Sequence, residues 1–263
     1  FRGASLPLAH RAVSLARRLL PDDLAAAIAR SGLAALLRPT LEGRASGTVW
    51  VEVCAGPLAG ARLLLDLRCE KYYWLGTHER AFLRQLEREV SYGSVVWDVG
   101  AHIGYVALAL SRLAGPEGRV YANVEARGLA LSDRRGVARL VRSRSTLMAS
   151  IVRTEEGADE ILAPTDTVDG LVALGLRPPD VLKIDVEGAE ALVLRGARET
   201  IAAARPLLAL EIHSPEAGRE AVAALAVPYR FYDAQRRRRA EPPLEPGRYV
   251  AQPERCGGTR RCA

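Results

Sequence analysis

Aromatic side chains are scarce in this sequence: only 5% of its residues are Phe, Trp or Tyr, and it has a single methionine. The core must therefore be mainly aliphatic. The hydrophobic fraction of 49% and the charged fraction of 26% are those of a globular protein. At 263 residues, the chain is long enough for one large α/β domain with appendages or for two small domains.

Long apolar runs and paired cysteines are also missing. No uninterrupted apolar run reaches the about 18 residues of a membrane span, and no signal peptide is evident. The four cysteines lack the spacing of a zinc site. Cys256 and Cys262 could pair if oxidised, but reduced thiols are the simpler interpretation. We therefore expect a cytoplasmic protein without a membrane span.

No long stretch carries charge of one sign. The net charge is +6, yet the 37 basic residues are interspersed with 31 acidic ones. The one concentrated basic run, Arg236 to Arg239, comes after the strand-like segment 229–233 and is typical of a solvated turn. We therefore expect no nucleic-acid partner.

The most informative stretch is residues 94–113, SVVWDVGAHIGYVALALSRL. A short apolar run ends in Asp98, and Gly100 and Gly104 bracket a turn into an amphipathic segment that starts at Tyr105. This pattern predicts a strand, a tight turn and a helix, the place where open α/β sheets bind ligands. The spacing is not the dinucleotide fingerprint, and the acid would repel a pyrophosphate. A cationic cofactor without phosphate, such as S-adenosylmethionine, suits it better than NAD; an ordinary packing turn is the alternative.

The residues before this stretch predict an extension. Apolar positions at helical spacing in residues 5–38 predict two helices, for which packing or homodimerisation is favoured over a membrane-surface role. Alternation over residues 48–67 predicts a hairpin. A helix is expected from Thr77, which would cap it, to Val90.

Strands alternate with helices in the remainder, which favours a doubly wound sheet. The expected strands are 95–98, 119–122, 125–131, 136–141, 181–185, 207–212 and 229–233, closed by an antiparallel strand in 248–253. The expected helices are 105–113, 166–174, 189–203 and 215–225. We divide the chain into an N-terminal helical extension (1–45), a hairpin and linking helix (46–92), a core (93–253) and a tail (254–263).

A second group of polar residues follows two later strands of this core. Asp98, Asp185, Glu187, Glu211 and His213 could line one crevice, because adjacent parallel strands bring their ends together. Such a set can abstract a proton or hold a divalent metal, and we favour proton abstraction without a metal. Glu190, one turn further on, is interpreted as structural.

These segments together resemble the FkbM-type S-adenosylmethionine-dependent methyltransferases. The matching pieces are YYWLGTHE (72–79), VVWDVGAHIGYVAL (95–108), LALSDRRG (129–136), PPDVLKIDVEGAEALVLRGA (178–197) and RPLLALEIH (205–213). The resemblance implies a class I methyltransferase (Rossmann-like) fold with a doubly wound, mostly parallel seven-stranded sheet. It also implies O-methylation of a hydroxyl on a sugar, glycolipid or secondary metabolite.

The resemblance also implies roles for single residues. Five residues would form the S-adenosylmethionine loop: Asp98, Gly100, His102, Gly104 and Tyr105. Asp133 would approach the adenine, and Asp185 and Glu187 would face the methyl-transfer site. His102 stands where the family commonly has asparagine, which is a mild departure because both side chains form hydrogen bonds.

The sequence departs more seriously from the family at Ala122. The second strand of the family ends in an acid that binds the ribose hydroxyls, and a helical crossover follows. Here both the acid and about twenty residues of crossover are missing, and the single residue Asn123 is too short to connect two parallel strands. A segment omitted from the sequence is our favoured explanation, and a natural deletion is the other.

The general base is predicted to be His213, because imidazole titrates near neutral pH. Asp185 is the second candidate, and a packing or capping role for His213 stays open. Two other functions are kept: a non-catalytic binding protein that has lost the ribose site, and an NAD-dependent oxidoreductase. The acceptor, a small molecule or glycan, cannot be read from the sequence, because substrate-binding parts of such folds lie in variable loops.

Overall fold

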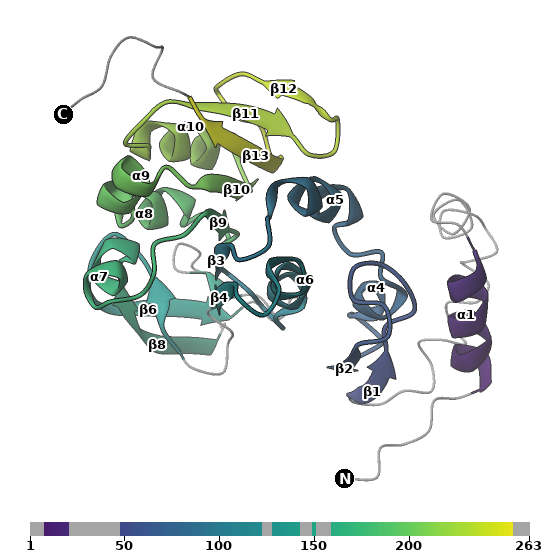
Figure 1. The fold of residues 1–263 in the computed structure, drawn as a ribbon. Helices are drawn as coiled ribbons and strands as arrows, with labels where there is room; N and C mark the ends of the chain where they lie inside the picture. Colours follow the sequence, from purple (N-terminus) through teal and green to yellow (C-terminus); the bar gives the residue numbers. More distant parts are fainter. Residues whose placement is uncertain (1–7, 21–47, 123–127, 143–148, 151–158, 255–263) are drawn as a thin grey trace. The chain divides into compact units, whose positions relative to one another are not determined.

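The structure is a computed structural model that describes residues 8–20, 48–122, 128–142, 149–150 and 159–254. The chain divides into two compact units, residues 1–83 and 84–263 (Figure 1). Among the described residues, no helix combines the length and the apolar content that crossing a membrane requires.

The first unit contains the expected hairpin. Strands β1 (Val49–Glu52) and β2 (Arg62–Leu65) pair in antiparallel fashion. Helix α1 (Leu8–Leu19) confirms the first expected N-terminal helix. The second expected helix lies in residues 21–47, outside the described residues.

The helix expected over residues 77–90 is present but begins later, and its expected cap at Thr77 is wrong, because a separate short helix ends there. Helix α4 (Lys71–Leu75) ends at Gly76, which has a φ of 66° and donates its N–H to the carbonyls of Tyr72 and Tyr73. The Thr77 N–H also bonds to the Tyr72 carbonyl, at 3.0 Å. Thr77 therefore belongs to the end of α4, and α5 (Arg80–Glu89) begins three residues later.

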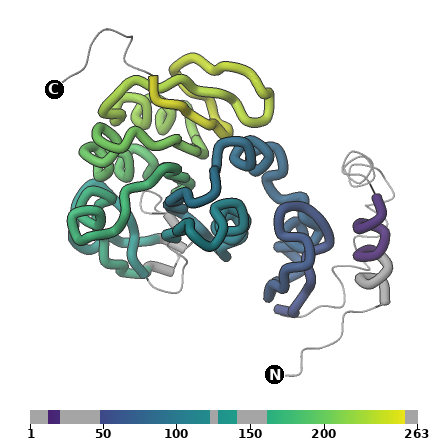
Figure 2. Tube along the Cα trace, in the orientation of Figure 1, coloured from purple at the N-terminus to yellow at the C-terminus, as the bar shows by residue number. Residues whose placement is uncertain are grey.

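A seven-stranded mixed sheet forms the centre of the second unit, with the order β12-β11-β13-β10-β9-β3-β4. Its strands are β3 (Val95–Val99), β4 (Arg119–Ala122), β9 (Val181–Ile184), β10 (Leu207–Ile212), β11 (Tyr229–Asp233), β12 (Arg238–Ala240) and β13 (Gly247–Pro253). The first four in chain order pair in parallel, and the last three pair antiparallel at the other edge, the yellow end of the chain in Figure 2.

The sheet has three parallel and three antiparallel pairings, whereas a mostly parallel sheet was expected. The connections explain the difference. Only residues 234–237 join β11 to β12, too few for the crossover that a parallel pair needs. The antiparallel closing strands were themselves predicted.

A smaller, four-stranded sheet has the order β5-β8-β6-β7. It consists of β5 (Ala130–Leu131), β6 (Gly136–Arg142), β7 (Ala149–Ser150) and β8 (Asp159–Asp166). The expected third strand of the main sheet, 125–131, is represented here by β5, which pairs in parallel with β8. The missing crossover after Ala122 falls at residues 123–127, outside the described residues.

Within the described part of the second unit, five helices follow the strands. They are α6 (Tyr105–Ala114), α7 (Val168–Ala173), α8 (Glu190–Arg195), α9 (Arg198–Ala204) and α10 (Pro215–Ala224). The single helix expected over 189–203 is split into α8 and α9. The Asp169 carboxylate accepts hydrogen bonds from the N–H groups of Glu199 and Thr200, and so caps α9 as a separate helix.

The two faces of the main sheet are covered differently. Side chains alternate along a strand, and Val95, Trp97 and Val99 of β3 join one core cluster with Leu194 of α8 and Ile201 of α9. In Figure 1, α8, α9 and α10 lie on one side of the sheet and α6 on the other. Asp98, between two members of the cluster, therefore projects on the α6 side.

Candidate active site

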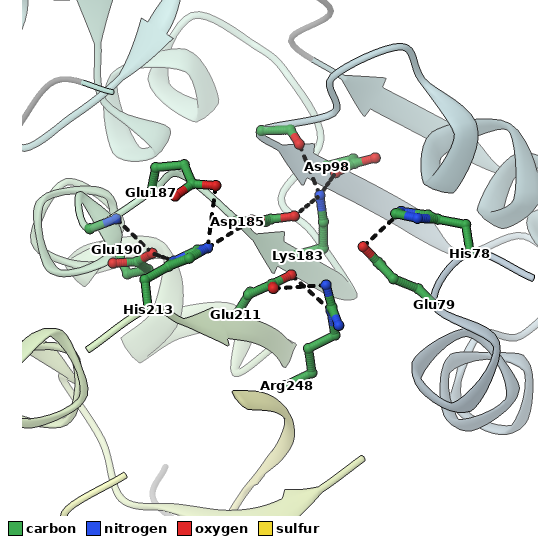
Figure 3. A network of polar contacts seen from close by, with 12 residues as sticks. His78, Glu79, Asp98, Lys183, Asp185, Glu187, Glu190, Glu211, His213 and Arg248 are labelled. Atoms are coloured by element: carbon green, nitrogen blue, oxygen red, sulfur yellow. Dashed lines mark hydrogen bonds and ion pairs between the residues drawn. The ribbon is translucent and has the colours of Figure 1, made fainter. Parts of the chain in front are cut away.

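Three neighbouring strands place charged residues on the same face of the sheet. Asp98 of β3 lies opposite Lys183 of β9 in the parallel register. Lys183 and Glu211 each stand between two residues of the core cluster on their strand, so both project away from that cluster. Asp185 and His213 come directly after β9 and β10. The expected gathering of strand ends is thus present in the structure (Figure 3).

The ammonium group of Lys183 links two carboxylates. Its Nζ lies 2.9 Å from Asp98 Oδ1 and 3.4 Å from Asp185 Oδ2, and it donates to the Gly100 carbonyl at 3.0 Å. Asp98 and Lys183 are 1% and 2% exposed. Charges this deeply buried are stable only when they are paired, so the three groups hold one another in place.

The loop after β3 approaches the backbone that follows β9. Gly100 has a φ of 84°, and a Cβ there would lie 1.7 Å from the Asp185 carbonyl oxygen. Gly104 also has a positive φ, 81°, but a Cβ there would meet nothing within 4 Å. Helix α6 then begins at Tyr105 without a side-chain cap. Only a glycine at position 100 lets the loop lie this close to the end of β9.

Two predicted site residues that are not glycine also have left-handed backbones. His102 and Glu187 each have a φ of 50°. This conformation costs a residue with a Cβ about 1 kcal/mol or more, and such residues concentrate at functional sites. The strain at Glu187 turns the chain between β9 and α8, beside Asp185.

A carboxylate behind His213 fixes its imidazole ring. His213 Nδ1 lies 2.8 Å from Glu190 Oε1, which also accepts the Gly188 N–H at 3.0 Å. Glu190 is fully buried, with 0% exposure. On the other side of the ring, Nε2 lies 3.7 Å from Asp185 Oδ1 and 3.6 Å from Glu187 Oε1. Glu190, interpreted from the sequence as structural, therefore orients the predicted base.

The surroundings of His213 change its acidity. Burial alone lowers the pKa of the imidazole, but the hydrogen bond to Glu190 and the charges of Glu187, Glu190 and Asp185 outweigh burial and raise the pKa to about 9. The ring therefore carries a proton at pH 7. The premise that this imidazole titrates near neutral pH is wrong, because three carboxylates surround it.

Arg248 holds the last carboxylate of the group. It lies opposite Glu211 in the antiparallel register of β13 and β10, and its Nε and Nη2 atoms each lie 2.8 Å from a carboxylate oxygen of Glu211. This is the planar, two-point pairing that arginine makes best. The sequence reasoning missed the pairing of Arg248 with Glu211 and that of Lys183 with Asp98, because no local pattern fixes which residues lie opposite each other on neighbouring strands.

A family model for the methyltransferase FkbM domain matches residues 98–236, more than half of the chain. The chain belongs to the FkbM methyltransferase family. The matched region begins at Asp98 and contains Lys183, Asp185, Glu187, Glu190, Glu211 and His213. The predicted family is thereby confirmed, and with it a methyltransferase domain.

Two solved structures show weaker similarity. The methyltransferase FkbM from Methylobacillus flagellatus KT is 15% identical with a TM-score of 0.35, covering 71% of this chain and 53% of that one. The precorrin-6y C5,15-methyltransferase from Geobacter metallireducens GS-15 is 14% identical with a TM-score of 0.35, covering 66% and 88%. The chain thus spans about half the length of the solved FkbM protein. A comparison with curated proteins finds no match.

Not every residue predicted for this FkbM domain joins the cluster. Asp133 follows β5 of the smaller sheet, and its described contact is with the Ser132 hydroxyl, at 3.3 Å. Its approach to an adenine stays a prediction. Ala122 ends β4 directly opposite Asp98 in register, so this strand end carries a methyl group where the resemblance implied an acid.

Replacing the two loop glycines tests the close approach. Gly100→Ala should lower the free energy of unfolding by at least about 3 kcal/mol, because the added methyl group would meet a backbone oxygen. Gly104→Ala, the matched control with the same sign of φ and open space, should cost only about 1 kcal/mol. Denaturant unfolding measures both values, and equal losses would contradict the described loop.

The acidity of His213 can be measured directly by NMR titration of the four histidines in metal-free protein. Loss of one signal in His213→Gln assigns the resonance. We expect a pKa of about 9, because removing the proton would leave three carboxylates around a neutral ring. A pKa at or below 6.5 would show that the carboxylates do not act on the ring as described.

Proposed function

We propose that this FkbM methyltransferase uses S-adenosylmethionine and transfers its methyl group to a hydroxyl oxygen, on a doubly wound class I methyltransferase core. The observation that supports this most is the convergence of Asp98, Lys183 and Asp185 at adjacent strand ends, where a glycine loop leads into α6. This is where open α/β sheets bind cofactors. The cofactor would occupy the loop formed by Asp98, Gly100, His102, Gly104 and Tyr105.

Charge favours a cationic donor over a dinucleotide. Asp98 precedes the loop and is buried against Lys183. The pyrophosphate of NAD would bring negative charge toward the carboxylates at these strand ends, whereas S-adenosylmethionine brings a sulfonium and an ammonium group. The glycine spacing also differs from the dinucleotide fingerprint. We therefore rank the oxidoreductase lowest of the three functions.

The proposed reaction is an in-line displacement. The acceptor oxygen forms a bond to the methyl carbon while the bond between carbon and sulfur breaks, and the electron pair stays on the sulfur of S-adenosylhomocysteine. The hydroxyl proton passes to a base. Positioning of the two reactants and removal of this proton are therefore the tasks of the protein.

A carboxylate suits the role of base better than His213. A ring that is protonated at pH 7 cannot accept the hydroxyl proton, whereas Asp185 and Glu187 lie on its open side at 3.7 and 3.6 Å. Both keep partly exposed side chains, at 22% and 15%. His213, Asp185 and Glu187 thus remain the proposed catalytic set, with a carboxylate as the proton acceptor and His213 orienting it.

A second candidate function rests on one specific observation. Ala122 places no carboxylate at the end of β4, beside Asp98, so an acid that would bind the ribose hydroxyls is missing from this position. A chain without that contact could bind a partner instead of turning over a cofactor. The intact charge cluster favours the enzyme.

The acceptor, the oligomeric state and the cellular location are further parts of this proposal. A sugar, glycolipid or secondary metabolite would supply the hydroxyl, and the N-terminal helices could join two copies. The described cysteines, Cys54 and Cys69, are both free thiols. Free thiols fit a reducing compartment, so we propose a cytoplasmic location.

Calorimetric titration tests this function without knowledge of the acceptor. S-adenosylmethionine and S-adenosylhomocysteine should bind to the 263-residue chain with micromolar affinity, and NAD should not. Asp98→Asn should weaken both, because it removes the charge beside the loop. Glu216→Gln is the control, since Glu216 is exposed on α10 and paired with Arg219. If neither S-adenosylmethionine nor S-adenosylhomocysteine binds, the alternative of a non-catalytic binding protein is favoured.

A further inference from the structure

The site holds three potential metal ligands of mixed chemistry. Asp185, Glu211 and His213 each offer one ligand atom, and these three atoms lie within 4.8 Å of one another. Ligand atoms about 2.1 Å from a common cation lie about 3 to 4 Å apart. Shifts on the order of an ångström would therefore bring the three atoms around one ion.

The hydrogen bonding behind His213 independently indicates a metal ligand. A metal-binding histidine almost always gives its other ring N–H to a carboxylate, which fixes the tautomer and the ring orientation. Glu190, fully buried and bonded to the Gly188 N–H, holds Nδ1 in this way. Nε2 is thereby directed toward the Asp185 carboxylate (Figure 3).

The second ligand is also held from behind. Arg248 contacts both oxygens of the Glu211 carboxylate through Nε and Nη2, and these two contacts fix the plane of the carboxylate. Each carboxylate oxygen can accept from more than one direction, so a pairing with Arg248 is compatible with a cation on the other side. Supporting contacts to ligating carboxylates are a regular feature of metal sites.

The charge balance of the group points in the same direction. Its carboxylates are Asp98, Asp185, Glu187, Glu190 and Glu211, and its cations besides His213 are Lys183 and Arg248. A ligating histidine is neutral, because the metal takes the place of a proton on the ring. Five negative charges against two positive ones then leave an excess of three, and one divalent cation would reduce this excess to one.

We propose that Asp185, Glu211 and His213 bind a divalent cation at the acceptor side of the site, contrary to the metal-free site that the sequence favoured. Two carboxylates and one imidazole suit ions such as Mn²⁺. The role of the ion rests on the proposed function: it binds the acceptor hydroxyl oxygen and lowers the pKa of that hydroxyl. The proton passes to Glu187, and the oxygen then takes the methyl group from sulfur.

The test is a titration of the chelator-treated 263-residue chain with Mn²⁺, with free Mn²⁺ followed by electron paramagnetic resonance. We expect one site per chain. Glu211→Gln and His213→Gln should each weaken binding at least about tenfold. Glu216→Gln removes an exposed carboxylate from α10 and should leave the affinity unchanged. Two ligand variants are used so that misfolding of one, checked by circular dichroism, does not decide the result.

The absence of a Mn²⁺ site, or equal affinity in both ligand variants and the wild type, would overturn the proposal. Titration of the same metal-free sample with S-adenosylhomocysteine separates this result from the fate of the proposed function. If S-adenosylhomocysteine binds but Mn²⁺ does not, the proposed cation site is rejected and the proposed methyltransferase function is retained. If the wild type binds Mn²⁺ and both variants lose this binding, but S-adenosylhomocysteine does not bind, the cation site is supported and the assigned cofactor is rejected.

Discussion

The buried ammonium group of Lys183 is the contact on which the site depends. It stands on β9, the strand between β3 and β10, and pairs with Asp98 and Asp185 while bonding to the Gly100 carbonyl. Replacing Lys183 by a neutral residue would leave the buried carboxylate of Asp98 without the positive charge of Lys183, which costs several kcal/mol. One side chain thus fixes the glycine loop and the Asp185 carboxylate together.

Around this contact, the domain holds several carboxylates close together, and the protonated ring of His213 compensates part of their mutual repulsion. Asp185, Glu187 and Glu190 surround one imidazole, and the strained backbone of Glu187 positions one of them. Such unfavourable groupings persist only where the surrounding structure holds them and are common where chemistry occurs. The fully apolar core on the opposite face of the sheet supplies the stability that the site lacks.

The elements and site residues that a short sequence pattern determines were predictable from the sequence. The apolar run and glycines gave β3, the turn and α6, and the meeting of strand ends gave Asp98, Asp185 and His213 as neighbours. Contacts set by tertiary structure were not. Lys183 is a charged residue inside a buried strand, Glu190 resembles an ordinary acid at a helix start, and β8 pairs with segments whose register no local pattern fixes.

The most direct test of this account is a crystal structure of the chain with S-adenosylhomocysteine. Its amino-acid end should lie at the loop from Asp98 to Tyr105, and its sulfur should face Asp185 and Glu187 at the ends of β3 and β9. A cofactor bound elsewhere on the chain, with the Asp98–Lys183–Asp185 contacts unchanged and the loop empty, would contradict the claim that these strand ends form the active site.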